Sequence, residues 1–128
     1  MIEIEQPISV GVDMVEILRV ERLMARYGSR FLNRVFTEIE QAECNNTPER
    51  YAVRFAAKEA TSKVLGTGIG IVSWRDIEVK HLASGKPYLN LYGAADRRAK
   101  QLGLVNWAVS LSHSQSNALA FVVATKAS

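Results

Sequence analysis

The segment from Pro48 to Leu65 constrains the fold of this 128-residue chain more than any other, because it has start and stop signals for one long helix. Pro48 suits the first helical position, where no backbone N–H is required, and Thr47 precedes it as a candidate N-cap. Gly66 can adopt the left-handed conformation that ends a helix. One face of the predicted helix is apolar and carries Val53, Ala57, Ala60 and Val64.

A second face of this helix carries Glu59 and Lys63, which are one turn apart. Lys58 adjoins Glu59, and the helix runs into the glycine loop Gly66-Thr67-Gly68. A carboxylate beside two lysines and a glycine loop is a combination of groups typical of a site that binds a metal ion and phosphate. The alternative is a solvated ion pair worth a few tenths of a kcal/mol. The loop is itself ambiguous, because it lies at the negative end of the helix dipole, whereas phosphates prefer the other end.

The first predicted strand holds an acidic residue in an unusual place. Apolar residues alternate with small or polar ones, so that one face carries Ile8, Val10, Val12 and Met14 and the other carries Ser9, Gly11 and Asp13. Asp is depleted in strands, and Gly11 is expected to leave open space on the face of Asp13. Asp13 is therefore a candidate functional residue. The alternative is an exposed strand aspartate without a function.

The last part of the chain predicts a strand that ends in Leu111-Ser112-His113-Ser114. One face of this predicted strand carries Trp107, Val109, Leu111 and His113. The other face includes Ser110 and Ser112. A lone histidine at the end of a strand is more often structural than catalytic. Its role stays open on this segment alone.

The remaining elements follow from periodicity, caps and turns. We expect a helix containing Val20, Leu23, Met24 and Tyr27 that ends at Gly28, a helix from Thr37 to about Cys44 with a Thr37–Glu40 capping box, a hairpin over residues 77–92, a helix over about 94–102, and two strands joined by a turn at 114–117. This order predicts an α+β fold with early helices and an antiparallel sheet that dominates later.

Composition narrows the class of protein. The length fits one domain over residues 1–128, and 48% hydrophobic residues are ample for a core. The longest apolar run, 118–124, is far shorter than the ~20 residues of a membrane span, and no leader pattern opens the chain. A single cysteine, Cys44, excludes an internal disulfide and fits a reducing compartment. We therefore expect a cytoplasmic protein without a membrane partner.

The first helix gathers arginines along one edge of its apolar stripe. Arg19, Arg22 and Arg26 fall within a narrow arc, and Arg30 follows the stop at Gly28. The net charge of +3 is too mild to specify nucleic acid but favours an acidic partner. Guanidinium groups bind carboxylates bidentately, which predicts docking of such a partner. The alternative is a solvated helix face.

Five segments, taken together and in order, resemble the holo-acyl-carrier-protein synthase family, the short branch of the 4′-phosphopantetheinyl transferases. They are Gly11-Val12-Asp13, the stretch Arg54–Lys63 with its Lys58-Glu59-Ala60 centre, Gly66-Thr67-Gly68, Gly85-Lys86-Pro87 and Ser110–Ser114. The resemblance extends from about Ile8 to Ala124. It implies the fold of that family, assembled as a homotrimer.

The resemblance also implies a reaction. A serine of an apo acyl carrier protein attacks the β-phosphoryl group of coenzyme A, accepts 4′-phosphopantetheine and releases adenosine 3′,5′-bisphosphate, in fatty-acid biosynthesis. Asp13 and Glu59 hold Mg²⁺, Glu59 is the candidate base, and Lys63 neutralises or protonates the leaving phosphate. The coenzyme A site is expected to include Lys58, Lys63, Gly66, Lys86, Pro87, Ser112 and His113. Arg19 and Arg26 match the carrier-binding arginines of the family, and Arg22 and Arg30 extend that set.

Two further expectations concern the metal and the assembly. The larger, surfactin-type branch places a third acid two residues after the strand aspartate, where this chain has Val15, so a water is expected in that coordination position. Glu16 is the nearest alternative ligand, but in a regular strand it points away from Asp13. By analogy with that branch, the active site is expected to lie between subunits. The alternative function is a non-catalytic basic module that binds an acidic protein or RNA, although no aromatic residues interleave with the arginines.

Overall fold

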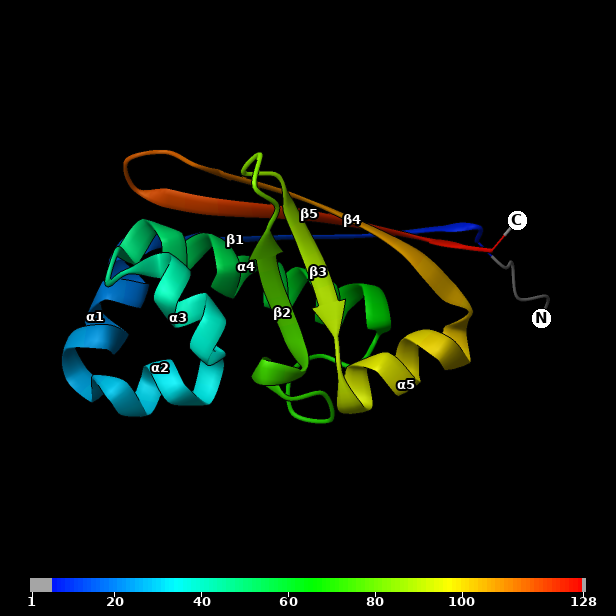
Figure 1. The fold of residues 1–128 in the computed structure, drawn as a ribbon, viewed down its shortest axis with the longest axis horizontal. Coiled ribbons are helices and arrows are strands. Elements are labelled where there is room, and N and C mark those ends of the chain that lie inside the picture. Colours follow the sequence, from blue (N-terminus) through cyan, green and yellow to red (C-terminus); the bar gives the residue numbers. More distant parts are fainter. Residues whose placement is uncertain (1–5, 128) are drawn as a thin grey trace.

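The computed structural model describes residues 6–127 as an α+β fold in which one long helix packs on an antiparallel sheet. The elements are β1 (Ile8–Glu16), α1 (Ile17–Tyr27), α2 (Ser29–Val35), α3 (Glu38–Cys44), α4 (Pro48–Leu65), η1 (Trp74–Asp76), β2 (Ile77–His81), β3 (Pro87–Leu91), α5 (Gly93–Leu102), β4 (Leu104–His113) and β5 (Asn117–Lys126). Helices α1, α2 and α3 gather at one end of the long sheet and α5 lies at the other (Figure 1). The predicted α+β class with an antiparallel sheet is confirmed, whereas assembly as a trimer stays a prediction.

Helix α4 is the central element, and its bounds are those predicted from Pro48 and Gly66. Gly66 ends the helix in the left-handed conformation, at φ 73°. Thr47 occupies the N-cap position, but its hydroxyl donates to the carbonyl of Asn45 and makes no capping hydrogen bond. Most side chains of α4 are buried, because the three-stranded sheet, α1, α3, α5 and the β2–β3 hairpin all contact it.

The three-stranded sheet has the order β1-β5-β4, with both pairs antiparallel. In β5, the residues on the face toward α4 are small or β-branched and fully buried: Ala118, Ala120, Val122 and Ala124. Gly11 of β1 pairs with Val122 and lies against the carbonyl oxygen of Ala60, where a Cβ atom would collide. The open space expected beside Asp13 is therefore absent, because the backbone of α4 fills it. Gly11 serves close packing of helix on strand.

The opposite face of the same sheet is apolar and exposed. Its large side chains, each 40–64% exposed, are Ile8, Val10, Val12, Met14, Leu119 and Phe121. They alternate with residues that face α4, as the strand period requires. An exposed apolar surface of this kind is a candidate interaction face.

The smaller elements complete the fold. The Thr37–Glu40 capping box of α3 is present as predicted, and β2 and β3 form the predicted hairpin. The short helix α2 was not predicted. It places Phe31 in an aromatic cluster that continues through Phe36 and Tyr51. Within residues 6–127, no helix is long and apolar enough to cross a membrane.

Candidate active site

Asp13, Glu59 and Lys63 meet where β1 crosses α4. Asp13 lies on the face of the sheet that α4 covers, opposite Ala120. The ammonium of Lys63 donates to Asp13 Oδ1 at 2.9 Å and to the carbonyl oxygen of Val12 at 3.0 Å. Glu59 lies one turn before Lys63 on the same helix. Asp13 thus forms one cluster with two residues that follow it by 46 and 50 positions in the sequence.

The electrostatics of this cluster favour a cation. Burial raises the pKa of Glu59, and the nearby carboxylate of Asp13 raises it further, while Arg19 and Lys63 oppose the shift. Two carboxylates that repel each other in a half-buried site offer hard oxygen ligands for a divalent ion. Within the described residues, no group of three or more His, Cys, Asp or Glu side chains is placed to hold a metal. The cluster therefore contains two carboxylates that could hold a metal ion.

The neighbours of Asp13 along β1 do not add a third acidic ligand. Val15 is buried in the core on the same face as Asp13. Glu16 has the opposite parity and is exposed at the start of α1.

Lys58 is not available to a ligand, which corrects its predicted role in binding phosphate. Its side chain is fully buried, and its ammonium donates to Glu40 Oε1 at 2.7 Å and to the carbonyl oxygens of Trp74 and Ile77. These three bonds use all three N–H groups of the ammonium. Burial lowers the pKa of Lys58, and the Glu40 carboxylate opposes that shift.

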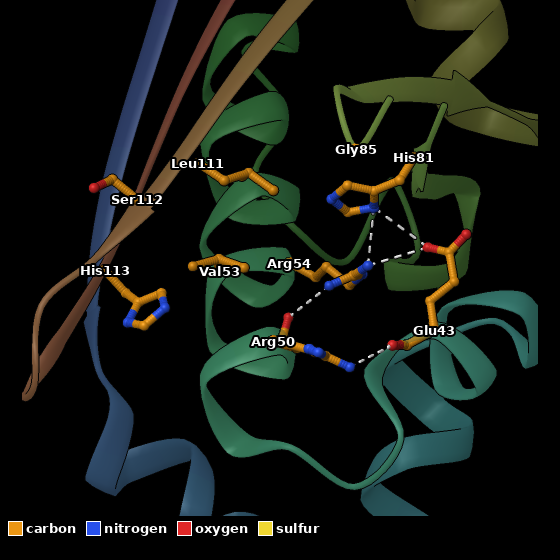
Figure 2. Close-up of a pocket in the computed structure, with 9 residues that line it drawn as sticks. All are labelled: Glu43, Arg50, Val53, Arg54, His81, Gly85, Leu111, Ser112 and His113. Atoms are coloured by element: carbon orange, nitrogen blue, oxygen red, sulfur yellow. Dashed lines mark hydrogen bonds and ion pairs between the residues drawn. The ribbon is translucent and has the colours of Figure 1, made fainter. Parts of the chain in front are cut away.

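A hollow of about 410 Å³ lies between the first half of α4, the β2–β3 hairpin and the end of β4. Its polar lining consists of Glu43, Arg50, Arg54, His81, Ser112 and His113. Figure 2 shows the His113 ring directed toward α4 and the Ser112 hydroxyl directed away from it, as their opposite parity requires. The structure thus brings His113 to this pocket and places the Ser112 side chain toward the open face of the sheet.

Arg54 is the central cation of this pocket. Its Nη2 donates to Glu43 Oε2 at 3.0 Å and lies 3.0 Å from His81 Nδ1, while Nη1 donates to the Arg50 carbonyl oxygen at 3.1 Å (Figure 2). Its Nε is buried and has no hydrogen-bond partner among the described residues. Two arginines against one carboxylate, with two histidine rings beside them as possible hydrogen-bond donors, make the pocket suitable for an anion.

Sequence reasoning did not single out Arg50 or His81, and it named Arg54 only as the start of the motif stretch Arg54–Lys63. Arg54 and Arg50 are four residues apart and share a helix face, which was a usable signal. Arg54 and His81 are 27 positions apart, and no local pattern connects them.

The remaining predicted coenzyme A residues lie at two separate places. Gly85 lines the pocket at the tip of the hairpin, and Lys86 and Pro87 follow it, with Lys86 exposed. Gly66 lies at the far end of α4, about 18 Å along the helix axis from Arg54. Arg54 and Glu59 also point from different sides of α4, about 140° apart. Within one protomer, the carboxylate cluster and the His113 pocket therefore face different directions.

The predicted arginine edge forms one basic surface. Arg19, Arg22 and Arg26 line a hollow over α1 that also includes Leu23 and Tyr27. Arg30 lines the adjoining hollow, together with Phe31 and Arg34, which sequence reasoning had not singled out. Within residues 6–127, none of these five arginines forms an ion pair with a carboxylate. The guanidinium of Arg19 stacks on the Phe55 ring at 5.6 Å, next to the carboxylate cluster.

Comparison with known proteins decides the family. The model of the 4′-phosphopantetheinyl transferase superfamily matches residues 9–122. The chain belongs to this superfamily. A holo-[acyl-carrier-protein] synthase from Herpetosiphon aurantiacus is 49% identical over 120 residues, which cover 88% of this chain and 94% of that protein. One from Alkalilimnicola ehrlichii is 47% identical over 121 residues, covering 91% and 94%. The predicted resemblance is confirmed, and this phosphopantetheinyl transferase is an enzyme of the holo-[acyl-carrier-protein] synthase type.

Solved structures agree with this assignment. The Helicobacter pylori holo-[acyl-carrier-protein] synthase in complex with coenzyme A has a TM-score of 0.84 and 31% identity, covering 91% of this chain and 99% of that one. The Bacillus anthracis synthase, in complex with coenzyme A (3′,5′-ADP), has a TM-score of 0.76 and 35% identity, covering 93% and 96%. The phosphopantetheinyl transferase fold is thus present over nearly the whole chain.

Proposed function

We propose that this chain transfers 4′-phosphopantetheine from coenzyme A to a serine of an apo acyl carrier protein and releases adenosine 3′,5′-bisphosphate. The junction of Asp13, Glu59 and Lys63 carries the proposal, because it joins two carboxylates and a cation in one half-buried place. The names of the relatives and the coenzyme A complexes of two structural neighbours support it.

Glu59 is the proposed general base. The serine oxygen forms a bond to the β-phosphorus, and the bond from that phosphorus to the bridging pyrophosphate oxygen breaks. The electron pair stays with the leaving bisphosphate, and the serine proton passes to the Glu59 carboxylate. A raised pKa makes Glu59 a stronger base than an ordinary surface glutamate. Lys63, one turn away, neutralises or protonates the leaving phosphate.

Asp13 and Glu59 fit Mg²⁺ because they offer hard oxygen ligands and mutual repulsion that a divalent ion relieves. When bound, the ion neutralises charge on the pyrophosphate. Lys63 donates to the Asp13 carboxylate, so its ammonium supplies a positive charge beside the same two carboxylates.

Coenzyme A is proposed to lie along the basic side of the pocket. In this pocket, Lys86, Ser112 and His113 remain the candidates for its phosphates, and Pro87 is proposed to shape the site. Lys63 and Gly66 remain candidates as well, although within one protomer they lie outside this pocket, farther along α4. We add Arg50 and Arg54, because the buried and unsatisfied Nε of Arg54 and the excess of cations suit an anion. Lys58 is withdrawn from the set, since its ammonium is fully used inside the protein.

The carrier protein is proposed to dock on the arginine surface of α1. Arg19, Arg22, Arg26 and Arg30 are exposed and free of ion pairs among the described residues, so they can bind carboxylates of an acidic partner. The contact of Arg19 with Phe55 places this surface next to Glu59, where the carrier serine must arrive.

A homotrimer with sites between subunits is proposed for two reasons. The open face of the β1-β5-β4 sheet is apolar, and a second copy of the chain would bury it. The carboxylate cluster and the His113 pocket face different directions within one protomer. A neighbouring subunit can present its own His113 pocket to the cluster.

Incubation with coenzyme A, Mg²⁺ and an apo acyl carrier protein tests the function. Intact-mass measurement should show the carrier heavier by one phosphopantetheine group. The Asp13→Asn protein, purified in the same way, should lose transfer by orders of magnitude, which excludes a contaminating transferase. Carrier binding without any mass change would instead favour the non-catalytic module. A single domain over residues 1–128, a cytoplasmic location, a role in fatty-acid biosynthesis and the absence of nucleic-acid and membrane partners stay predictions.

A further inference from the structure

A buried ion pair connects helix α4 to the β2–β3 hairpin. Lys58 and Glu40 are both fully inaccessible to solvent, and their charged groups are 2.7 Å apart. The pair is fully hydrogen-bonded. Glu40 Oε1 also accepts from the backbone N–H of Thr37, and Glu40 Oε2 accepts from the backbone N–H of Val79 at 2.9 Å. A buried pair of this kind gives little net stability, so its function must be sought in what it holds in place.

The pair occupies the edge of β2 that has no strand beside it. The sheet of the hairpin contains only β2 and β3. Alternate residues of a strand direct their backbone groups to the same edge. Lys58 binds the carbonyl oxygen of Ile77, and Glu40 binds the N–H of Val79, which are alternate residues of β2. The two side chains thus take the place of a neighbouring strand.

A second buried acid strengthens this attachment. Glu78 lies between Ile77 and Val79 and is 3% exposed. It accepts from the Thr37 hydroxyl at 2.6 Å and from the Tyr92 hydroxyl at 2.9 Å. Thr37 therefore bonds to both buried acids and joins the start of α3 to the same network.

The hairpin carries one wall of the His113 pocket, which is called the anion pocket below. His81 ends β2, and Gly85 lies at the hairpin tip. Arg50 and Arg54 of α4 line the pocket beside the hairpin, and Arg54 Nη2 lies 3.0 Å from His81 Nδ1. An isolated two-stranded hairpin is marginally stable in water, so its placement depends on what anchors it.

We propose that Lys58 and Glu40 are positioning residues, which fix the β2–β3 hairpin against α4 and so set the width of the anion pocket. This inference rests on the proposed function in one respect, the assignment of coenzyme A to this pocket. Neither residue touches the ligand. Their effect reaches it through the backbone of Ile77 and Val79.

Three variants separate positioning from stability alone. Lys58→Met leaves the buried Glu40 carboxylate without its counter-charge and should lower the melting temperature strongly. The double variant Glu40→Leu/Lys58→Met removes both charges and should regain part of that loss, but leaves Ile77 and Val79 without their side-chain partners. Glu40→Gln keeps the volume and gives a milder form of the same defect. Val20→Ala truncates a buried residue of α1 and serves as the control for lost stability.

Two readouts are measured below the melting temperature of each variant. Amide hydrogen exchange over residues 77–91 should be faster in the double variant and in Glu40→Gln than in the wild type, and unchanged in Val20→Ala. The dissociation constant for coenzyme A, from calorimetry without carrier protein, should rise about tenfold in the double variant. Wild-type exchange rates together with wild-type affinity in the folded double variant and in Glu40→Gln would overturn the proposal. Failure of the wild type to bind coenzyme A would instead refute the proposed function, and the exchange data would still decide on the anchoring of the hairpin.

Discussion

The surroundings of Glu59 make its carboxylate a stronger base, but they lower the stability of the folded protein when that carboxylate is ionised. Its carboxyl is half-buried beside Asp13, and both features raise its pKa. A raised pKa in the folded protein means that folding favours the protonated form. The stability associated with this form is therefore present at low pH, below the usual glutamate range, and is lost as pH rises through the pKa of the folded protein.

Glu59→Gln should consequently stabilise the protein at neutral pH while it abolishes transfer. Glutamine keeps the shape of protonated glutamate and cannot ionise, so the buried charge and its repulsion from Asp13 disappear. The melting temperature of the variant should exceed that of the wild type at pH 7, and the difference should vanish at acidic pH, where Glu59 is protonated in both the folded and the unfolded states. Thermal melts across this pH range provide the measurement. A variant less stable than the wild type at pH 7 would contradict the repulsion argument.

Lys63 should compete with a divalent ion for Asp13. Its ammonium lies 2.9 Å from Asp13 Oδ1 but is more than half exposed, so the pair itself adds at most about 1 kcal/mol of stability. Lys63→Met should therefore leave the melting temperature nearly unchanged and tighten Mg²⁺ binding several-fold in calorimetry without coenzyme A, while transfer falls. Lys63→Arg, which keeps the charge, is the control. Loss of Mg²⁺ binding in Lys63→Met would show that the lysine supports the metal site instead.

The packing of α4 on β1 brings the carboxylates together, and Gly11 permits it. A methyl group at this position would collide with the carbonyl oxygen of Ala60, the residue after Glu59. Gly11→Ala should therefore force the helix and strand apart, cost about 1–3 kcal/mol of unfolding free energy and lower transfer. Chemical denaturation and the carrier mass assay give the two values. Ser9→Ala, on the same face of β1, should change neither, and wild-type behaviour of Gly11→Ala would show that the contact can relax without consequence.

The arginines of α1 predict a separable defect. Arg19→Glu or Arg26→Glu should weaken the apparent affinity for the carrier protein, and the loss should shrink at high salt, because exposed charges act over about a Debye length. Coenzyme A binding, measured by calorimetry, should stay close to that of the wild type. Arg97→Glu, on the exposed side of α5, is a charge-matched control away from this surface. Equal damage to coenzyme A binding would place these arginines in the nucleotide site.

Local signals predicted the elements well, because capping and periodicity act over a few residues. Pro48 and Gly66 set both ends of α4, and Thr37 and Glu40 form their capping box. Helix α2 has only seven residues, which is too short for a helical period to stand out.

The surroundings of several residues could not be predicted from the sequence, because they depend on packing between segments that are far apart in the chain. From the sequence alone, Gly11 predicts open space beside Asp13. Only the fold shows that the backbone of Ala60 lies against it. From the sequence alone, Lys58 is predicted to be a cation that a ligand can reach. Only the fold shows that it is buried in an ion pair with Glu40, 18 positions away. The carboxylate cluster was predictable because the family motif names its members, whereas the pairing of Arg54 with His81 has no motif.

The exposed apolar face of the sheet bears on how the site is completed. Val10, Val12, Met14, Leu119 and Phe121 leave a protomer with a surface that water disfavours. In the proposed trimer this face is covered, and the same assembly brings the carboxylate cluster of one subunit toward the His113 pocket of the next. Activity should then depend on oligomers and on residues contributed by two chains.

Mixing of two inactive proteins tests this arrangement. Glu59→Gln damages the carboxylate cluster, and His113→Ala damages the pocket, so each variant alone should be severely impaired. When the two are unfolded together and refolded, some interfaces would combine an intact cluster from one chain with an intact pocket from the other. Part of the wild-type transfer rate should return, because only those interfaces hold two intact sets of residues. Native mass spectrometry must verify that mixed oligomers formed, and each variant refolded alone is the control. Verified mixed oligomers without recovered activity, or full activity in a dilute monomer, would show that each chain contains a complete site.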